Sequence, residues 1–143
     1  MPVLKDILAS GLQVVFCGTA VASDSASAGH YYAHPQNSFW RFLHDAGFTP
    51  RQLRPDEDQI VLDYGIGLTD LEKEITQSHD RGLNFSGASQ VASHIENAAP
   101  AWIAFNGKRA GKDAASALGH GVPRLGVAQW TIGISQTFMA AKQ

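Results

Sequence analysis

Two short apolar runs constrain the fold of this chain more than any other feature. Residues 12–17 (LQVVFC) and 101–105 (AWIAF) are rich in β-branched and aromatic side chains, and each follows a segment of helical character. Alternation of helices with such runs is typical of a parallel sheet covered by helices. Because 143 residues with 44% hydrophobic content suit one core, we expect one domain over residues 1–143. Its expected fold is a three-layer α/β/α domain with a short, mainly parallel central sheet.

The remaining elements follow from helix caps, turn residues and apolar spacing. We expect helices over residues 4–9, 39–46, 55–64, 86–98 and 110–118, and a last strand over 131–139. Residues 18–35 and 65–70 are expected to be loops, because they are rich in Gly, Ala and Ser and show no clear period. A long unpatterned segment in a compact chain indicates function. Since sites gather at the carboxyl ends of parallel strands, these two loops are expected to form the pocket.

Composition and missing signatures exclude several classes of protein. The formal net charge of -2 is far from the basic balance of a protein that wraps DNA, so any DNA contact must be local. Cys17 is the only cysteine, which excludes a disulfide framework within the chain. Residues 107–113 (GKRAGKD) lack the spacing of a phosphate-binding loop, and the histidines lack zinc-site spacing, so we expect no cofactor and no metal. With no membrane-length apolar stretch and no leader, the expected location is cytoplasmic.

Four motifs, in a fixed order and spacing, carry a family resemblance. Residues 14–18 (VVFCG), 29–40 (GHYYAHPQNSFW), 46–50 (AGFTP) and 62–70 (LDYGIGLTD) resemble the mismatch-specific uracil/thymine-DNA glycosylases, family 2 of the uracil-DNA glycosylase superfamily. The resemblance implies a monofunctional DNA-repair hydrolase that flips uracil, or a related mismatched or damaged base, out of DNA and cleaves its N-glycosidic bond. It also implies single-stranded or mismatched uracil-containing DNA as partner, and a monomeric protein associated with the nucleoid.

The chain departs from the family pattern at two places. The usual motif after the first strand is Gly-Ile-Asn-Pro-Gly, whose Asn positions the attacking water, but residues 18–22 read GTAVA and Ala20 has no polar side chain. The family also continues into a Pro-Ser/Asn-x-Ser-Gly loop that enters the duplex, and then into a helix, whereas here Met139 is followed by AAKQ. We therefore expect this loop and helix to be lacking and duplex binding to be weak. The alternative function is a noncatalytic module that binds uracil-containing or damaged DNA.

The chemistry still needs only a few groups. Cleavage of an N-glycosidic bond places positive charge on the sugar and negative charge on the departing base, so a carboxylate near the sugar and donors near the base suffice. Asp70 is the favoured catalytic residue, because some members with Gly-Thr in the first motif rely on an Asp at this position. The alternatives are that Asp70 caps a following turn, and that Asp24 is the catalytic carboxylate.

Base binding is assigned largely by the resemblance. It places Tyr32 under the flipped uracil, where an aromatic face is a suitable platform; the alternative is that Tyr32 packs on the 39–46 helix. Asn37 carries a donor and an acceptor that suit a pyrimidine edge, and capping that helix is its alternative role. The base is expected to be held by backbone amides of Gly18, Thr19 and Ala20.

A basic cluster is the candidate for DNA-backbone contacts. Lys108, Arg109 and Lys112 follow the second apolar run at the expected start of a helix, where backbone N–H groups also favour anions. We expect them to contact phosphates, and the alternative is a solvated helix face.

Overall fold

The computed structural model describes residues 4–20, 23–35, 37–72, 94–95, 97–106, 127–132 and 136–142. The helix expected over 110–118, and most of the one expected over 86–98, lie outside the described residues.

A five-stranded sheet forms the centre of the structure. Its strands are β1 (Val14–Ala20), β2 (Ile66–Glu72), β3 (Trp102–Asn106), β4 (Val127–Ile132) and β5 (Gln136–Lys142), in the order β2-β1-β3-β5-β4. β1 is parallel to both β2 and β3, β5 is antiparallel to β3, and β4 is antiparallel to β5. The expected α/β class, with a short parallel centre, is therefore confirmed.

The single last strand expected over residues 131–139 is wrong. The chain forms two antiparallel strands there, with Ile132 opposite Gln136 and Val127 opposite Ala141. Gly133 and Ser135 separate the two strands in the sequence and are residues that favour turns. An apolar run alone did not reveal this break.

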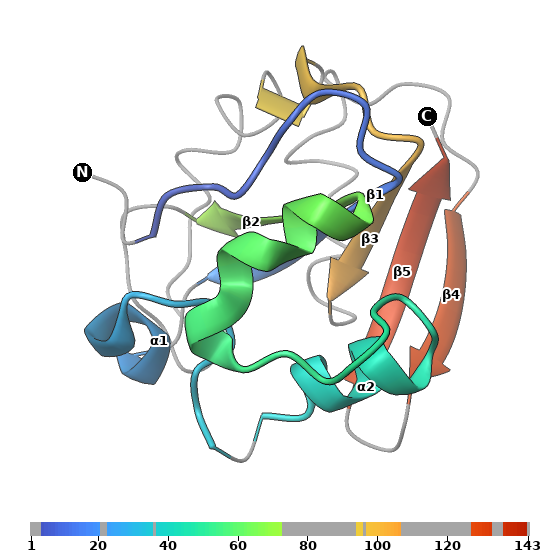
Figure 1. Ribbon diagram of the computed structural model, residues 1–143. Coiled ribbons are helices and arrows are strands. Elements are labelled where there is room, and N and C mark those ends of the chain that lie inside the picture. The colour runs from blue at the N-terminus through green and yellow to red at the C-terminus, as the bar shows by residue number, and fades with distance from the viewer. Residues whose placement is uncertain are drawn as a thin grey trace.

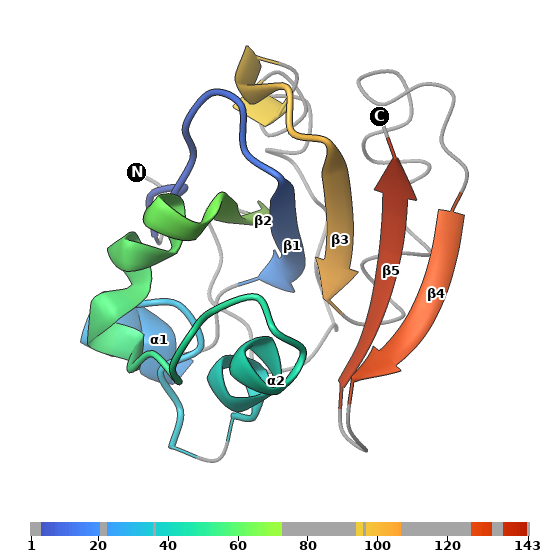
Figure 2. The ribbon, with the colours of Figure 1, turned by 45° about the vertical axis from the view of Figure 1, so that its right-hand side comes forward.

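Both faces of β1 are buried. Side chains alternate along a strand, so Val14 and Phe16 point to one face and Val15 and Cys17 to the other. Val15, Phe16 and Cys17 are all fully buried, as expected for a sheet with protein on both sides. Figures 1 and 2 show the helices α1 (Ser23–Ala28), α2 (Phe39–Asp45) and η1 (Pro55–Tyr64, the green coil) together on one side of β1 and β2. The main apolar cluster joins this layer to the sheet through Phe16 and Phe39.

The helices were predicted with mixed success. α2 and η1 match the expected positions, and η1 begins at Pro55 and ends at Gly65, which has the left-handed conformation. The expected loop over residues 18–35 is wrong in two respects, because β1 continues to Ala20 and α1 follows. α1 was missed because an Ala- and Ser-rich segment has no amphipathic period. No helix among the described residues is long and apolar enough to cross a membrane.

The expected loop over residues 65–70 is also wrong, because residues from Ile66 onward form β2. Gly67, which suggested a loop, instead allows a close approach of the N-terminal segment. A Cβ atom there would lie 2.8 Å from Leu12 Cδ1 and 2.9 Å from the Ile7 carbonyl oxygen. A glycine in a strand marks such an approach.

The N-terminal segment is extended rather than helical as expected over residues 4–9. Ile7 pairs with Leu68 on β2 through two backbone hydrogen bonds, each with an N···O distance of 2.9 Å. Leu4 and Ile7 are also buried in the main core. Pairing with the edge of β2 satisfies backbone groups that the strand would otherwise expose, and this outweighs the local helical preference.

Candidate active site

The carboxyl-terminal halves of β1 and β2 bring Gly18 and Asp70 side by side. The two residues are direct partners in the parallel register, two positions beyond the pair Phe16 and Leu68. Asp70 therefore continues the apolar stripe of β2 as a buried carboxylate near the end of the sheet. The expected position of Asp70, beside the end of the first strand, is confirmed; it lies within a strand and not at the end of a loop.

Tyr32 lies close to Gly18 and Asp70 and belongs to the helical layer that packs on the sheet. A Cβ atom built on Gly18 would lie 3.5 Å from the Tyr32 hydroxyl oxygen and 3.6 Å from Asp70 Oδ1. Three residues from separate segments thus converge on one small volume. Because Gly18 has no side chain, a phenol and a carboxylate both approach its backbone closely.

Tyr32 is held in an unusual conformation. Its backbone φ is 52°, in the left-handed region that residues with a Cβ atom rarely adopt. Its ring stacks on Phe39 of α2, with ring centroids 4.0 Å apart and planes inclined by 21°. The predicted alternative, packing on the α2 helix, is therefore observed. Non-glycine residues in this backbone region cluster at functional sites.

Tyr31 is a buried neighbour of Asp70 that the sequence did not indicate. Its hydroxyl group donates a hydrogen bond to the Lys5 carbonyl oxygen, with an O···O distance of 3.1 Å. Burial raises the pKa of Tyr31 most, and the negative charge of Asp70 raises it further, with a smaller contribution from a hydrogen bond to Asp70. Tyr31 therefore stays protonated beside the Asp70 carboxylate. The only feature of the sequence that could have indicated a role for Tyr31 is its position next to Tyr32.

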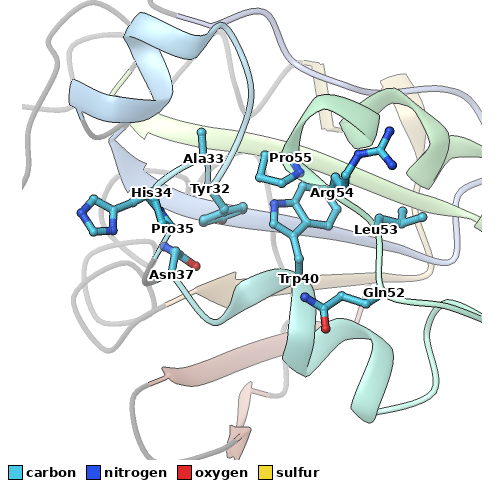
Figure 3. A pocket seen from close by; sticks show the side chains of 10 residues that line it. All are labelled: Tyr32, Ala33, His34, Pro35, Asn37, Trp40, Gln52, Leu53, Arg54 and Pro55. Atoms are coloured by element: carbon cyan, nitrogen blue, oxygen red, sulfur yellow. The ribbon is translucent and has the colours of Figure 1, made fainter.

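A cavity of about 320 Å³ adjoins this group of residues. Figure 3 shows its walls, which come from the turn after α1, from α2 and from the segment that enters η1: Tyr32, Ala33, His34, Pro35, Asn37, Trp40, Gln52, Leu53, Arg54 and Pro55. Tyr32 links the two places, because its ring lines the cavity while its hydroxyl oxygen lies near Gly18 and Asp70. Pockets of this size accommodate small ligands such as a single base.

The family of the chain is shown by its similarity to known proteins. A profile of the uracil DNA glycosylase superfamily matches residues 6–139. The chain belongs to this superfamily. The match includes residues of all five strands, and it includes Gly18, Tyr32 and Asp70. Membership indicates a glycosylase-type hydrolase that acts on DNA in repair.

Asn37 lies just before the helix of this glycosylase fold on which Tyr32 packs. Its Oδ1 atom accepts a hydrogen bond from the Phe39 N–H group at 2.8 Å. Ser38 holds the N-cap position of α2 and makes no side-chain cap hydrogen bond, so the capping position that the sequence offered for Asn37 is wrong. Asn37 instead bonds to the first residue of α2 from one position before the cap. Asn37 also lines the cavity beside Tyr32.

Other residues predicted for the site are described only in part. Thr19 and Ala20 continue β1 beyond Gly18, and Asp24 lies in α1, but the side chains of these three residues lie outside the described part of the structure. The basic residues Lys108, Arg109 and Lys112 also lie outside it. Where side chains are described, no group of three or more His, Cys, Asp or Glu residues is arranged to hold a metal ion.

Proposed function

We propose that this superfamily member is a uracil-DNA glycosylase of the mismatch-specific uracil/thymine type. It hydrolyses the N-glycosidic bond of uracil in DNA without a metal or cofactor. The observation that carries the proposal is the convergence of Gly18, Tyr32 and Asp70 where β1 and β2 end. A buried carboxylate with an aromatic residue next to it matches what the reaction requires of a site.

Asp70 supplies the charge that the reaction needs. Water adds to the sugar C1′ atom, the C1′–N1 bond breaks, and its electron pair leaves with the uracil ring. Asp70 stabilises the positive charge that develops on the sugar and accepts a proton from the attacking water. Its burial supports this role, because a fixed charge acts more strongly where water is excluded. Tyr31 stays neutral and lies buried beside Asp70, with its hydroxyl group bonded to the Lys5 carbonyl oxygen.

Tyr32 and Asn37 bind the base in this proposal. The extruded uracil enters by the cavity at Tyr32 and Asn37, and the ring of Tyr32 provides the surface on which it stacks. The Asn37 Nδ2 group donates to a uracil carbonyl oxygen while its Oδ1 atom accepts the bond from the Phe39 N–H group. Backbone amides of residues 18–20 hold the opposite edge of the base.

Contacts with the DNA backbone are local in this proposal. The formal net charge of -2 gives little general attraction to DNA, so Lys108, Arg109 and Lys112 bind phosphates next to the flipped nucleotide. Duplex opening costs a few kcal/mol, and single-stranded or mismatched uracil avoids part of that cost. Such substrates are therefore processed faster than uracil paired with adenine.

The experiment uses the purified chain and labelled oligonucleotides that contain one uracil. Single-stranded, U·G and U·A substrates are incubated with the protein and treated with alkali, which cuts the strand at abasic sites. The proposal requires cleavage at the uracil position, fastest for single-stranded or U·G DNA. Specific binding to these substrates without any abasic site would favour the noncatalytic DNA-binding alternative.

A further inference from the structure

We infer that Asp58 is a positioning residue that holds Tyr32 in its left-handed conformation, an inference that rests on the proposed role of Tyr32 in base binding. Asp58 lies in η1, outside the group of residues assigned to the reaction. Acidic residues are common in the first turn of a helix and are usually exposed there. The neighbouring Asp56 fits that pattern, whereas Asp58 is buried.

Both oxygens of Asp58 are directed at the turn that carries Tyr32. Oδ2 accepts a hydrogen bond from the Tyr31 backbone N–H group at 3.1 Å, and Oδ1 lies 3.2 Å from His30 Nδ1. A buried carboxylate is costly unless its oxygens find partners. Here the partners are the two residues immediately before Tyr32, so the burial of Asp58 and the shape of the turn depend on each other.

Two further contacts tie the same turn to the other helices. The Tyr31 carbonyl oxygen accepts a hydrogen bond from Trp40 Nε1 of α2 at 3.2 Å, and Ser25 Oγ of α1 accepts one from the Ala33 N–H group at 3.0 Å. Tyr32 is therefore fixed on both sides by contacts with three helices. Asp58 is the only charged member of this set, and hydrogen bonds to charged groups are the stronger ones.

The hydrogen bonds of Asp58, Trp40 and Ser25 explain how Tyr32 keeps its left-handed conformation. A left-handed backbone costs free energy for a residue with a Cβ atom and persists only when its surroundings enforce it. With the turn fixed, the Tyr32 ring stacks on Phe39 and its hydroxyl oxygen lies near Gly18 and Asp70. Without Asp58 the turn can relax, and the aromatic platform moves away from the carboxylate.

The first test follows Tyr32 directly and does not depend on catalysis. The chain has three tyrosines, so fluorine NMR of protein that carries 3-fluorotyrosine gives few resonances, and Tyr32→Phe assigns the one from Tyr32. Asp58→Ala should shift or broaden that resonance in a protein that remains folded by circular dichroism. Asp63→Ala, which removes an exposed carboxylate from the same helix, should leave it unchanged. Should Asp58→Ala fail to fold, Asp58→Leu fills the buried space without offering acceptors and is judged by the same outcomes.

The second test asks whether Asp58 acts through Tyr32. Asp58→Ala should slow uracil excision by about tenfold or more. It removes a charged acceptor and leaves the buried Tyr31 N–H group without that partner. Asp58→Asn keeps one acceptor for the Tyr31 N–H group and should restore most of the rate. In a Tyr32→Ala background, Asp58→Ala should have no further effect.

Separate results decide the inference and the proposed function. An unchanged Tyr32 resonance together with an unchanged rate in folded Asp58→Ala would overturn the inference. An equal loss of rate with and without Tyr32 would also overturn it, since Asp58 would then act by another route. If the parent protein excises no uracil, the proposed function fails, and the fluorine resonance alone decides the role of Asp58.

Discussion

Three glycine-to-alanine substitutions should separate the stability of the fold from its activity. At Gly18 the new Cβ atom would lie 3.5 Å from the Tyr32 hydroxyl oxygen and 3.6 Å from Asp70 Oδ1, which is ordinary van der Waals contact. Gly18→Ala should therefore leave the free energy of unfolding within about 1 kcal/mol of the parent value. The methyl group nevertheless lies beside Tyr32 and Asp70, where the proposal places the sugar and the attacking water, so excision should fall by about a hundredfold.

Gly47 and Gly67 are matched controls, because substitutions there should lower the stability of the fold. Gly47 has a φ of 89° with no atom within 4 Å of the added Cβ position, so Gly47→Ala should cost about 1 to 2 kcal/mol of stability and leave activity unchanged. At Gly67 a Cβ atom would lie 2.8 Å from Leu12 Cδ1, so Gly67→Ala should cost about 1 to 3 kcal/mol by overpacking.

Urea unfolding followed by circular dichroism gives the stabilities, and single-turnover cleavage of single-stranded uracil DNA gives the rates. The reasoning is refuted if folded Gly18→Ala cleaves at the parent rate, because the space beside Asp70 would then play no part in the reaction.

Three further predictions concern aromatic and basic residues. Tyr32→Ala should lose about 1 to 3 kcal/mol of base interaction in a binding assay with abasic and uracil-containing DNA, whereas Tyr32→Phe keeps most of it; equal excision by both variants would make Tyr32 purely structural. Because the folded state raises the pKa of Tyr31 above its usual value near 10, its contribution to stability is complete below pH of about 10 and is lost as the pH rises further. Alkaline ultraviolet titration should show a component in which Tyr31 ionises only on unfolding, and Tyr31→Phe should remove that component. Neutralising Lys108 and Arg109 should weaken binding to all DNA sequences alike and flatten its salt dependence, and an unchanged slope would place these residues away from the DNA.

The parts of the fold that local chemistry determines could be predicted from the sequence. β1 and β3 were indicated by their apolar, β-branched composition, and η1 by Pro55 at its start and Gly65 at its end. The parallel arrangement then placed Asp70 beside the end of β1, as the register shows.

The parts that depend on distant contacts could not be predicted. Gly67 was interpreted as a loop residue. A glycine is needed there because the Ile7 carbonyl approaches the strand closely, and Ile7 lies 60 positions away in the chain. The extended N-terminal segment and the contact of Asp58 with the Tyr31 backbone are also long-range interactions that leave no local period. The same holds for the left-handed backbone of Tyr32, which its surroundings impose.

The central claim is that the buried carboxylate of Asp70 drives cleavage, and Asp70→Asn tests it most directly. The amide has nearly the same shape, so the fold and DNA binding should be retained while the charge is lost. Removing one preorganised electrostatic group costs about 2.7 to 4 kcal/mol of transition-state stabilisation, which is roughly a hundred- to a thousandfold in rate. Asp24→Asn, the control for the second candidate carboxylate, should have a mild effect. Single-turnover excision of uracil from single-stranded DNA should therefore drop at least a hundredfold in Asp70→Asn, and an Asp70→Asn protein that cleaves at the parent rate would contradict the account.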